Sequence, residues 1–529
     1  MHHNILEEPV IRFSTSNGSP VHASLPAVFA ALIRDEVDAF PALRPHQRHA
    51  WHAFLAQLGA LATQRVGLNE PPDSAGEWRR ILRGLTSDFP DDEPWHLVVA
   101  DITKPAFMQP PAKTESRLKD YKTAMPTPDG LDMLVLSKNH DIKSAVATQA
   151  EADDWIFALI TLQTMEGFSG AGNYGISRMN GGLGSRAAFS LSSSTRSGAH
   201  LRRDLMGLME RHTSLVADYP MRDDGVALIW AEPWDGTKSE ALLLNQLNPY
   251  YIELCRRIRL RVKAGGELYG IKASSKAARI EAKNLKGKTG DPWMPINRKE
   301  NKSLTLASGG FTYDRVTEYL TPGNWEQPAL LRPIQSEKDA SAPALLLARA
   351  LVRGQGKTEG YYERIIPINA RVKKALTQRE SMNELGRIAQ ERIADVGEVK
   401  RILSHAIRIF ASRGDSNSVS TQHGNLARPW LNRLDELVDT RFFDDLQAEF
   451  DNDDIGSRNR IRKEWLMDEE RGVVNQARRI LQEAMEALPC PAIHRYRARA
   501  NAESLFYVRI RGPRGLASRF ADTDQGDEA

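Results

Sequence analysis

The sequence predicts an α+β N-terminal domain over residues 1–365, followed by an all-α four-helix bundle over residues 366–515. Short apolar runs, separated by many Gly, Pro and Trp residues, fill the first part without a regular alternation of strands and helices. Apolar stripes at spacings of three and four residues fill the second part, which is typical of amphipathic helices. The acidic and small residues at the end of the chain predict a disordered tail over residues 516–529.

The first domain contains apolar runs of two kinds. Runs longer than ten residues predict helices, whereas short runs rich in β-branched residues predict strands or buried segments. The predicted helices cover residues 25–37, 49–64 and 155–165, and the predicted strands cover residues 95–102, 131–137 and 225–234. Residues 104–130 and 284–310 resemble long loops, and long loops inside a compact domain are usually functional or mobile.

The second domain shows its periodicity most clearly between Val396 and Phe410. Its apolar residues at 396, 399, 403, 406 and 410 step by three and four, which places them on one helix face. Similar stripes begin at Leu431 and at Val473, and a last helix is predicted over residues 492–508. Four long helices with short polar connections are typical of a four-helix bundle.

Composition excludes several protein classes. The chain has 529 residues, of which 41% are hydrophobic, and no apolar run approaches the roughly 20 residues that a membrane span requires. Its first residues, MHHNILEEPV, lack the character of a signal peptide. Cys255 and Cys490 cannot form a disulfide framework or a four-cysteine zinc site. We therefore expect a cytoplasmic protein with no membrane partner, no cofactor and no structural metal.

Residues 167–186, GFSGAGNYGISRMNGGLGSR, are dense in glycine and contain no acid. Glycine permits close approach of the backbone to another molecule, and Arg178 and Arg186 suggest that this molecule is anionic. Residues 170–175 satisfy G-x-G-x-x-G, but a dinucleotide fingerprint needs a strand before it and a helix after it. Here a helix precedes the motif and more glycines follow it. A surface loop without a special role remains the alternative.

Basic residues are concentrated between 256 and 302, a segment that contains fourteen Lys or Arg but only four Asp or Glu. Such a segment favours contact with nucleic-acid phosphates, although a solvated basic face is the alternative. Smaller clusters occur at Arg196, Arg202 and Arg203, and at Arg495, Arg497 and Arg499. RGQGKT at 353–358 lacks the first glycine of a P-loop, because Leu351 occupies that position. We expect a basic turn near a nucleic-acid backbone there.

Residues 138–141, Lys-Asn-His-Asp, contain a His-Asp pair of the kind found in metal-dependent phosphohydrolases. That chemistry needs several further His and Asp ligands at one site. His46, His49 and His52 are close in sequence but have no carboxylate cluster beside them. We expect a nucleic-acid-binding protein without catalytic activity, and a stand-alone metal-dependent nucleic-acid hydrolase using His140 and Asp141 is the alternative.

A series of motifs over nearly the whole chain resembles the CasA family, the large subunit of the type I-E CRISPR surveillance complex Cascade. The motifs are PAFMQPP (105–111), LDMLVLSKNHDIK (131–143), GNYGISRMNGGLGSR (172–186), DPW (291–293) and RGQGKTEGYYER (353–364). The resemblance implies an N-terminal domain of unusual fold and a protein that reads a protospacer-adjacent motif in the minor groove of double-stranded DNA. It also implies binding to crRNA and other Cascade subunits, promotion of R-loop formation, and recruitment of a helicase–nuclease. The minor groove is about 6 Å wide, so bare backbone can enter it more readily than bulky side chains. Its pattern of hydrogen-bond donors and acceptors is degenerate, so a protein that reads a motif there tolerates several sequences.

The resemblance also implies roles for particular residues. A glycine loop falls on Gly170, Ala171, Gly172 and Asn173, where Asn173 replaces a glycine of the family. The candidates for a lysine finger are Lys283 and Lys286, and those for a wedge that opens the duplex are Lys357 and Thr358. Candidate contacts to crRNA or partner subunits are Lys138, Asn139, His140 and Lys143. Arg495, Arg497 and Arg499 form the predicted basic surface of the bundle.

Overall fold

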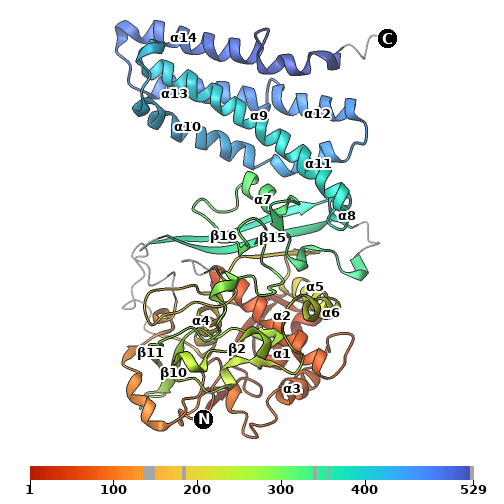
Figure 1. Ribbon diagram of the computed structural model, residues 1–529, viewed down its shortest axis with the longest axis vertical. Coiled ribbons are helices and arrows are strands. Elements are labelled where there is room, and N and C mark those ends of the chain that lie inside the picture. The colour runs from red at the N-terminus through yellow and green to blue at the C-terminus, as the bar shows by residue number, and fades with distance from the viewer. Residues whose placement is uncertain (133, 135–148, 181–185, 338–341, 355–356, 525–529) are drawn as a thin grey trace. The chain divides into compact units, whose positions relative to one another are not determined.

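A computed structural model of the chain describes residues 1–132, 134, 149–180, 186–337, 342–354 and 357–524. The chain divides into two compact units (Figure 1). Unit 1 comprises Met1–Phe311 and Gly323–Thr377, and unit 2 comprises Thr312–Pro322 and Gln378–Ala529. The boundary predicted at 365/366 instead falls inside strand β16 (Lys357–Ile368), and a short segment of the predicted N-terminal domain belongs to unit 2.

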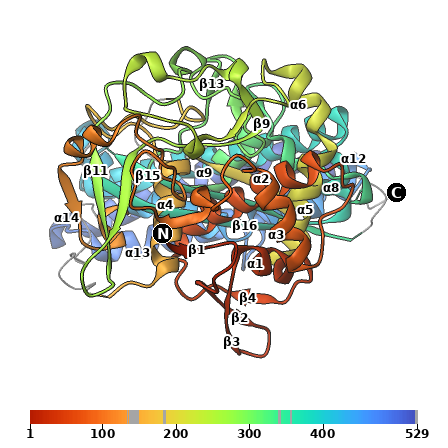
Figure 2. The same cartoon turned by 90° about the horizontal axis from the view of Figure 1, so that it is seen from below.

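Most residues of α2 in unit 1 are buried. α2 packs against α3, α4 and α5, and α1 packs against α3 and α5 (Figure 2). The bounds are α1 (Leu25–Ile33), α2 (Arg48–Arg65), α3 (Ala75–Gly84), α4 (Ala152–Met165), α5 (Ser197–Glu210), α6 (His212–Asp218) and α8 (Ala370–Ala375). The three helices predicted from sequence are confirmed as α1, α2 and α4. α1 ends earlier than predicted because Asp35 adopts a left-handed conformation before strand β4 begins.

The strands of unit 1 form small sheets of two or three strands, and all their pairings in the described residues are antiparallel except that of β8 with β9. The sheet orders are β1-β5, β3-β2-β4, β10-β11-β6, β13-β12-β14, β16-β15-β7 and β8-β9. The bounds are β1 (His2–Asn4), β2 (Ile11–Thr15), β3 (Pro20–Ala23), β4 (Val37–Ala39), β5 (His96–Val98), β6 (Thr123–Met125), β7 (Ala188–Ser192), β8 (Val226–Leu228), β9 (Leu247–Ile252), β10 (Arg257–Val262), β11 (Leu268–Ala273), β12 (Ile296–Asn297), β13 (Lys302–Ser303), β14 (Trp325–Glu326), β15 (Ala344–Gly354) and β16 (Lys357–Ile368).

Strands are shorter than the apolar runs that predicted them. β5 and β8 each take only three residues of the predicted strands at 95–102 and 225–234, and a 3-10 helix follows β8. Most of the predicted strand at 131–137 lies outside the described residues. The predicted long loops at 104–130 and 284–310 contain β6, β12 and β13. The longest strand pair, β15 with β16, was not predicted.

Unit 2 is helical, as predicted for this part of the chain. Its helices are α7 (Tyr313–Leu320), α9 (Arg379–Ala411), α10 (Thr421–Asp439), α11 (Phe442–Phe450), α12 (Ile455–Met467), α13 (Val473–Ala487) and α14 (Ala492–Arg511). α9 packs against α10, α13 and α14, and the apolar stripe from Val396 to Phe410 is buried along it. A bundle of four helices stays a prediction, because α7, α11 and α12 belong to the same unit.

The end of the chain differs from the disordered tail predicted over residues 516–529. Leu516–Asp524 form a 3-10 helix, which packs against α12 and α14. Residues 525–529 lie outside the described part of the chain. Among the helices of the described residues, none combines the length and the apolar character needed to cross a lipid bilayer.

His49 of α2 generates a prediction about pH. Both of its ring nitrogens are buried without a hydrogen-bond partner among the described residues, and the ring stacks on Tyr361 with centroids 5.8 Å apart. Burial lowers the pKa of His49 to about 3. The unfolded chain binds a proton at this residue below about pH 6.5, whereas the folded chain does not. Its stabilising contribution is therefore complete above that pH and is lost as the pH falls.

We expect His49→Leu to reduce the slope of unfolding free energy against pH by up to about 1.4 kcal/mol per unit between pH 6 and pH 4. Urea unfolding of the full chain at several pH values measures this slope. His22→Leu on β3 is the matched control, because His22 is exposed and its replacement should leave the slope unchanged. An unaltered slope in His49→Leu would contradict the prediction.

Candidate nucleic-acid interface

The glycine segment starts directly after α4 with a tight turn. Ser169 donates its backbone N–H to the carbonyl of Asn173 (2.9 Å), and Asn173 donates to the carbonyl of Gly170 (3.0 Å). Gly170 and Gly172 have φ of +102° and +80°, a conformation that side chains with a Cβ rarely adopt. The predicted glycine loop therefore forms a turn that depends on glycine at these two positions.

The turn lies against the segment that follows β11. Ser275 donates its backbone N–H to the carbonyl of Gly172 (3.2 Å), and the Tyr174 hydroxyl donates to the carbonyl of Lys276 (3.0 Å). A Cβ added to Gly172 would lie 2.9 Å from the Cβ of Ser274, whereas one added to Gly170 would meet nothing within 4 Å. Gly172 thus permits the close approach of two protein segments, and Gly170 faces open space.

These two segments enclose a cavity of about 790 Å³, which we call the lysine groove. It is lined by residues of 167–180 and 276–286 together with Lys238 and Ala241. The turn of residues 170–173 does not itself line the cavity, but residues on both sides of it do. The structure therefore brings the glycine segment beside Lys283 and Lys286, which are more than 100 positions further along the chain.

The charge of the lysine groove is positive. Lys238, Lys276, Lys283 and Lys286 line it and are exposed, and Glu281 is the one acid among its described lining residues. Within the described part of the chain, none of these lysines forms an ion pair. Lysines free of acidic partners attract the phosphates of a nucleic acid. Both candidates for the lysine finger therefore lie in one basic groove. Lys276 belongs to the basic segment predicted at 256–302, and Lys238 is an addition that the sequence did not single out.

The two arginines of the glycine segment are not available to an anionic partner molecule, contrary to the expectation from sequence, because both are engaged inside the protein. Arg178 is fully buried, stacks on the Tyr251 ring at 4.0 Å and donates to the Tyr251 carbonyl (3.0 Å). Arg186 is also buried and donates to Oδ1 of Asp291 (2.7 Å). Both guanidiniums therefore stabilise the interior of unit 1, and the groove takes its positive charge from lysines.

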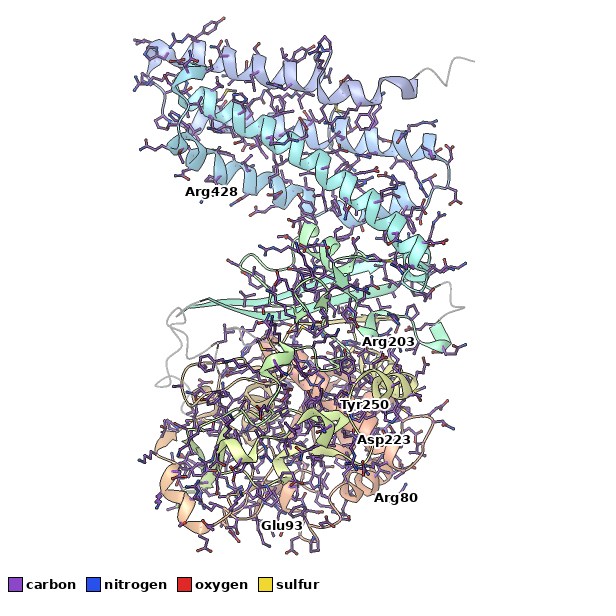
Figure 3. All side chains as sticks on the ribbon, viewed as in Figure 1. Arg80, Glu93, Arg203, Asp223, Tyr250 and Arg428 are labelled. Atoms are coloured by element: carbon purple, nitrogen blue, oxygen red, sulfur yellow. The ribbon has the colours of Figure 1, made fainter. Side chains whose placement is uncertain are left out.

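Other basic residues predicted to contact phosphates also lie inside unit 1. Arg279 is buried and donates to the carbonyl of Glu240 (2.8 Å), and burial lowers its pKa to about 10. Arg203, which Figure 3 labels in unit 1, pairs with Asp204 and Glu337. The distances are 3.0 Å to Asp204 and 3.4 Å to Glu337. Arg196 pairs with Asp35 (2.6 Å). Arg196 and Arg203 are therefore neutralised internally, whereas Arg202 is exposed and donates to the carbonyl of Ile33.

Lys357 and Thr358 lie at the end of the hairpin formed by β15 and β16, where they pair with Gly354 and Arg353. A strand follows the RGQGKT segment, whereas a P-loop requires a helix there, so the segment is not a P-loop. A hairpin end is a suitable place for a wedge, and that role stays a prediction. The described residues do not include the predicted crRNA or partner contacts Lys138, Asn139, His140 and Lys143, nor do they include Asp141.

The three arginines of α14 are exposed, but each also has a partner within unit 2. Arg495 donates to the carbonyl of Met485 (3.1 Å) and Arg497 to that of Arg413 (3.1 Å). Arg499 pairs with Glu503 (2.9 Å). The basic surface predicted on the bundle stays a prediction, and Glu503 offsets part of its charge.

Histidines meet carboxylates that are distant in sequence, which corrects the expectation that His46 and His52 lack acidic neighbours. His46 Nε2 lies 2.7 Å from Asp132, and His52 Nε2 lies 2.9 Å from Asp204. His52, His200 and Asp204 are arranged as three ligands of a metal ion could be. Asp204, however, also accepts hydrogen bonds from Trp293 Nε1 (2.9 Å) and Arg203. Protein donors thus satisfy its carboxylate, and the cluster ties α2 and α5 to the Trp293 segment.

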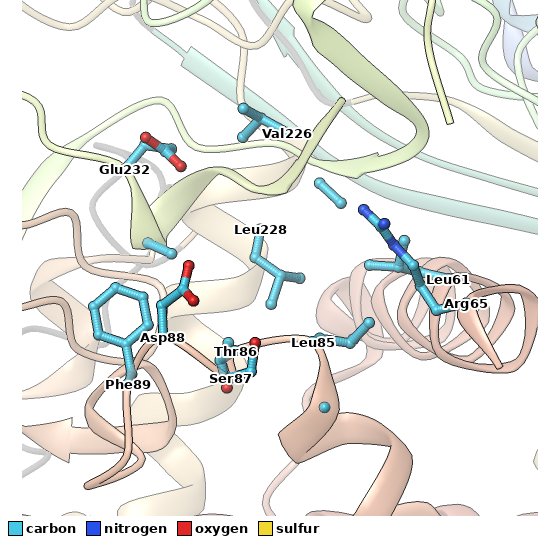
Figure 4. A pocket seen from close by; sticks show the side chains of 13 residues that line it. Leu61, Arg65, Leu85, Thr86, Ser87, Asp88, Phe89, Val226, Leu228 and Glu232 are labelled. Carbon is cyan, nitrogen blue, oxygen red and sulfur yellow. The ribbon is translucent and has the colours of Figure 1, made fainter. Parts of the chain in front are cut away.

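A second pocket, of about 360 Å³, lies between the end of α2 and β8 (Figure 4). Arg65 is the one cation among its described lining residues, and Asp88 and Glu232 contribute two carboxylates. Their charge does not suit a polyanion. The lysine groove is therefore the better candidate for a nucleic-acid contact.

Comparisons with known proteins agree with this fold. Residues 4–475 match the family described as CRISPR-associated protein Cse1. Cse1 from Acidimicrobium ferrooxidans is 13% identical with a TM-score of 0.62, and the match covers 99% of both chains. CasA from Thermus thermophilus is 16% identical with a TM-score of 0.62, covering 96% of this chain and 98% of that one.

A chain of a structure described as a CRISPR RNA-guided surveillance complex is 14% identical, with a TM-score of 0.51 and coverage of 96% of this chain and 99% of that one. At such identities these structures establish the fold alone. No curated protein matches the sequence. The family match spans most of the chain, which therefore belongs to the Cse1 family, the large subunit of the type I-E CRISPR complex Cascade.

Proposed function

We propose that this chain recognises a protospacer-adjacent motif in duplex DNA through the lysine groove and the adjoining glycine turn. The observation that carries the proposal is the convergence of four exposed lysines, free of ion pairs within the described residues, beside a turn whose Gly170 faces open space. Phosphate contacts position a protein on DNA without reading its sequence. Backbone at Gly170 can enter a groove about 6 Å wide, where a bulky side chain would be obstructed.

The proposal extends to the steps that follow recognition. Lys357 and Thr358, at the end of the β15–β16 hairpin, would act on the duplex as it opens for crRNA pairing. Lys138, Asn139, His140 and Lys143 would contact crRNA or partner subunits, and Arg495, Arg497 and Arg499 would contact partners or target DNA. A separate helicase–nuclease would be recruited, and the chain itself would act in the cytoplasm without a catalytic step.

Substitution of Gly170 tests the role of the glycine turn. We expect Gly170→Ala to weaken binding of the assembled complex to motif-bearing duplex by about tenfold, because the added methyl group projects into the space that DNA would occupy. Binding to motif-free duplex should change little. Electrophoretic mobility shifts with both duplexes measure the two affinities.

Gly266→Ala is the matched control, because Gly266 has φ of +87° and also has open space around its missing Cβ. Both substitutions impose similar backbone strain, roughly 1–2 kcal/mol. Only Gly170→Ala should alter motif-dependent binding. Equal behaviour of the two variants would remove Gly170 from the interface. Gly172→Ala is less suitable, since its Cβ would displace Ser274.

Substitution of the groove lysines tests their contact with phosphates. Each of three variants should lose one phosphate contact, so that the slope of log K against log salt becomes less steep by about one unit. The variants are Lys276→Gln, Lys283→Gln and Lys286→Asn. Asparagine is chosen at 286 because that residue has φ of +48°, which asparagine tolerates.

Lys263→Gln is the control for this series. Lys263 is exposed but pairs with Glu267 (2.7 Å), so its replacement should leave the salt slope as it is in the wild type. The measurement is a titration of motif-bearing duplex at several salt concentrations. Slopes equal to that of the wild type in all three groove variants would leave the lysines as a solvated face.

A further inference from the structure

The inner wall of the lysine groove is more apolar than phosphate contacts require. Ile176, Met179 and Ile280 line it and are at most 5% exposed. Phosphate binding needs cations at a surface, and it gains nothing from an apolar recess. A volume of about 790 Å³ falls within the range of pockets that bury small ligands, roughly 300–1,000 Å³. The recess therefore suits a flat apolar group attached to an anion.

An aromatic side chain forms part of the same wall. Phe168 is 38% exposed, and in the described part of unit 1 no other Phe, Trp or Tyr side chain is exposed. Its ring lies 6.0 Å from that of Tyr174, and the two planes are inclined by 58°. The hydroxyl of Tyr174 is fixed by its hydrogen bond to Lys276. Phe168 thus presents a ring to solvent from a position that its aromatic neighbour restrains.

A nucleotide that has left the base stack has the chemistry that this wall and these lysines would recognise. Its base has an apolar face that stacks on aromatic side chains, and its phosphates are anionic. We propose that the groove captures one unpaired nucleotide of the target DNA beside the motif, with the base against Phe168 and the phosphates near Lys276, Lys283 or Lys286. The inference rests on the proposed function and adds a second ligand state, in which the duplex is locally open.

The test uses the assembled complex and two motif-bearing duplexes. One duplex is fully paired, and the other has a single mismatch at the base pair next to the motif. The wild-type complex should bind the mismatched duplex more tightly than the fully paired one, because the mismatch removes the free-energy cost of unpairing that base. Phe168→Ala should lose this gain in affinity for the mismatched duplex. The expected loss is a factor of about 5 to 150, the range typical of stacking one base on an aromatic side chain. Phe168→Tyr should keep it.

Leu118→Ala is the matched control, since Leu118 is 45% exposed in the same unit but does not line the groove. An unchanged gain in Phe168→Ala, with motif dependence intact, would overturn this inference alone. Absence of motif dependence in wild type would instead overturn the proposed function.

The source of the nucleotide is tested with single-stranded DNA and RNA ten-mers of equal sequence and the full chain. Weaker DNA binding in Phe168→Ala supports the assignment to target DNA. A loss confined to RNA would contradict it.

Discussion

The buried guanidinium of Arg256 holds the two ends of the glycine turn together. It donates to the carbonyls of Gly167 (3.2 Å) and Tyr174, and it lies 3.7 Å from the Glu166 carboxylate. The side chain of Gln163 on α4 accepts a hydrogen bond from the backbone N–H of Arg256 (2.8 Å). This bond ties α4 to the residue that directly precedes strand β10. A turn rich in glycine loses much conformational entropy on folding, and these bonds help to offset that loss. The shape of the groove therefore depends on an interaction inside the protein.

The buried arginines near the glycine segment and the lysines of the groove have different structural roles in unit 1. Arg178, Arg186 and Arg256 are buried, where their planar groups stack on rings or donate several hydrogen bonds to carbonyls and carboxylates. The exposed lysines of the groove remain available to a mobile anionic partner. This division explains how a chain with a formal net charge of only +3 can present a strongly basic groove. Total charge and the number of basic residues in a segment are poor guides to such a surface.

Sequence patterns predicted what depends on local periodicity. The stripe from Val396 to Phe410 and the apolar run at 155–165 became α9 and α4, because helix contacts lie three and four residues apart. The glycine segment and the lysine candidates were also identified from sequence, and the structure placed them side by side. The β15–β16 hairpin was missed although its strands are adjacent in the chain, because the β15 run ALLLARALVRG is rich in Leu and Ala and has few of the β-branched and aromatic residues that indicate strands. The partners of Arg186 and His52, which are Asp291 and Asp204, were missed because they lie far beyond a local window of the sequence.

Hydrogen–deuterium exchange of the assembled complex tests the central claim most directly. Peptides covering residues 167–176 and 274–288 should exchange more slowly when motif-bearing duplex is added, because DNA would cover the turn and the lysine segment. Motif-free duplex should protect them less at equal concentration. The pocket at residues 84–89 and 226–232 serves as the internal reference and should exchange equally in both cases. Equal protection by both duplexes, or protection confined to the reference pocket, would contradict recognition of the motif through the lysine groove.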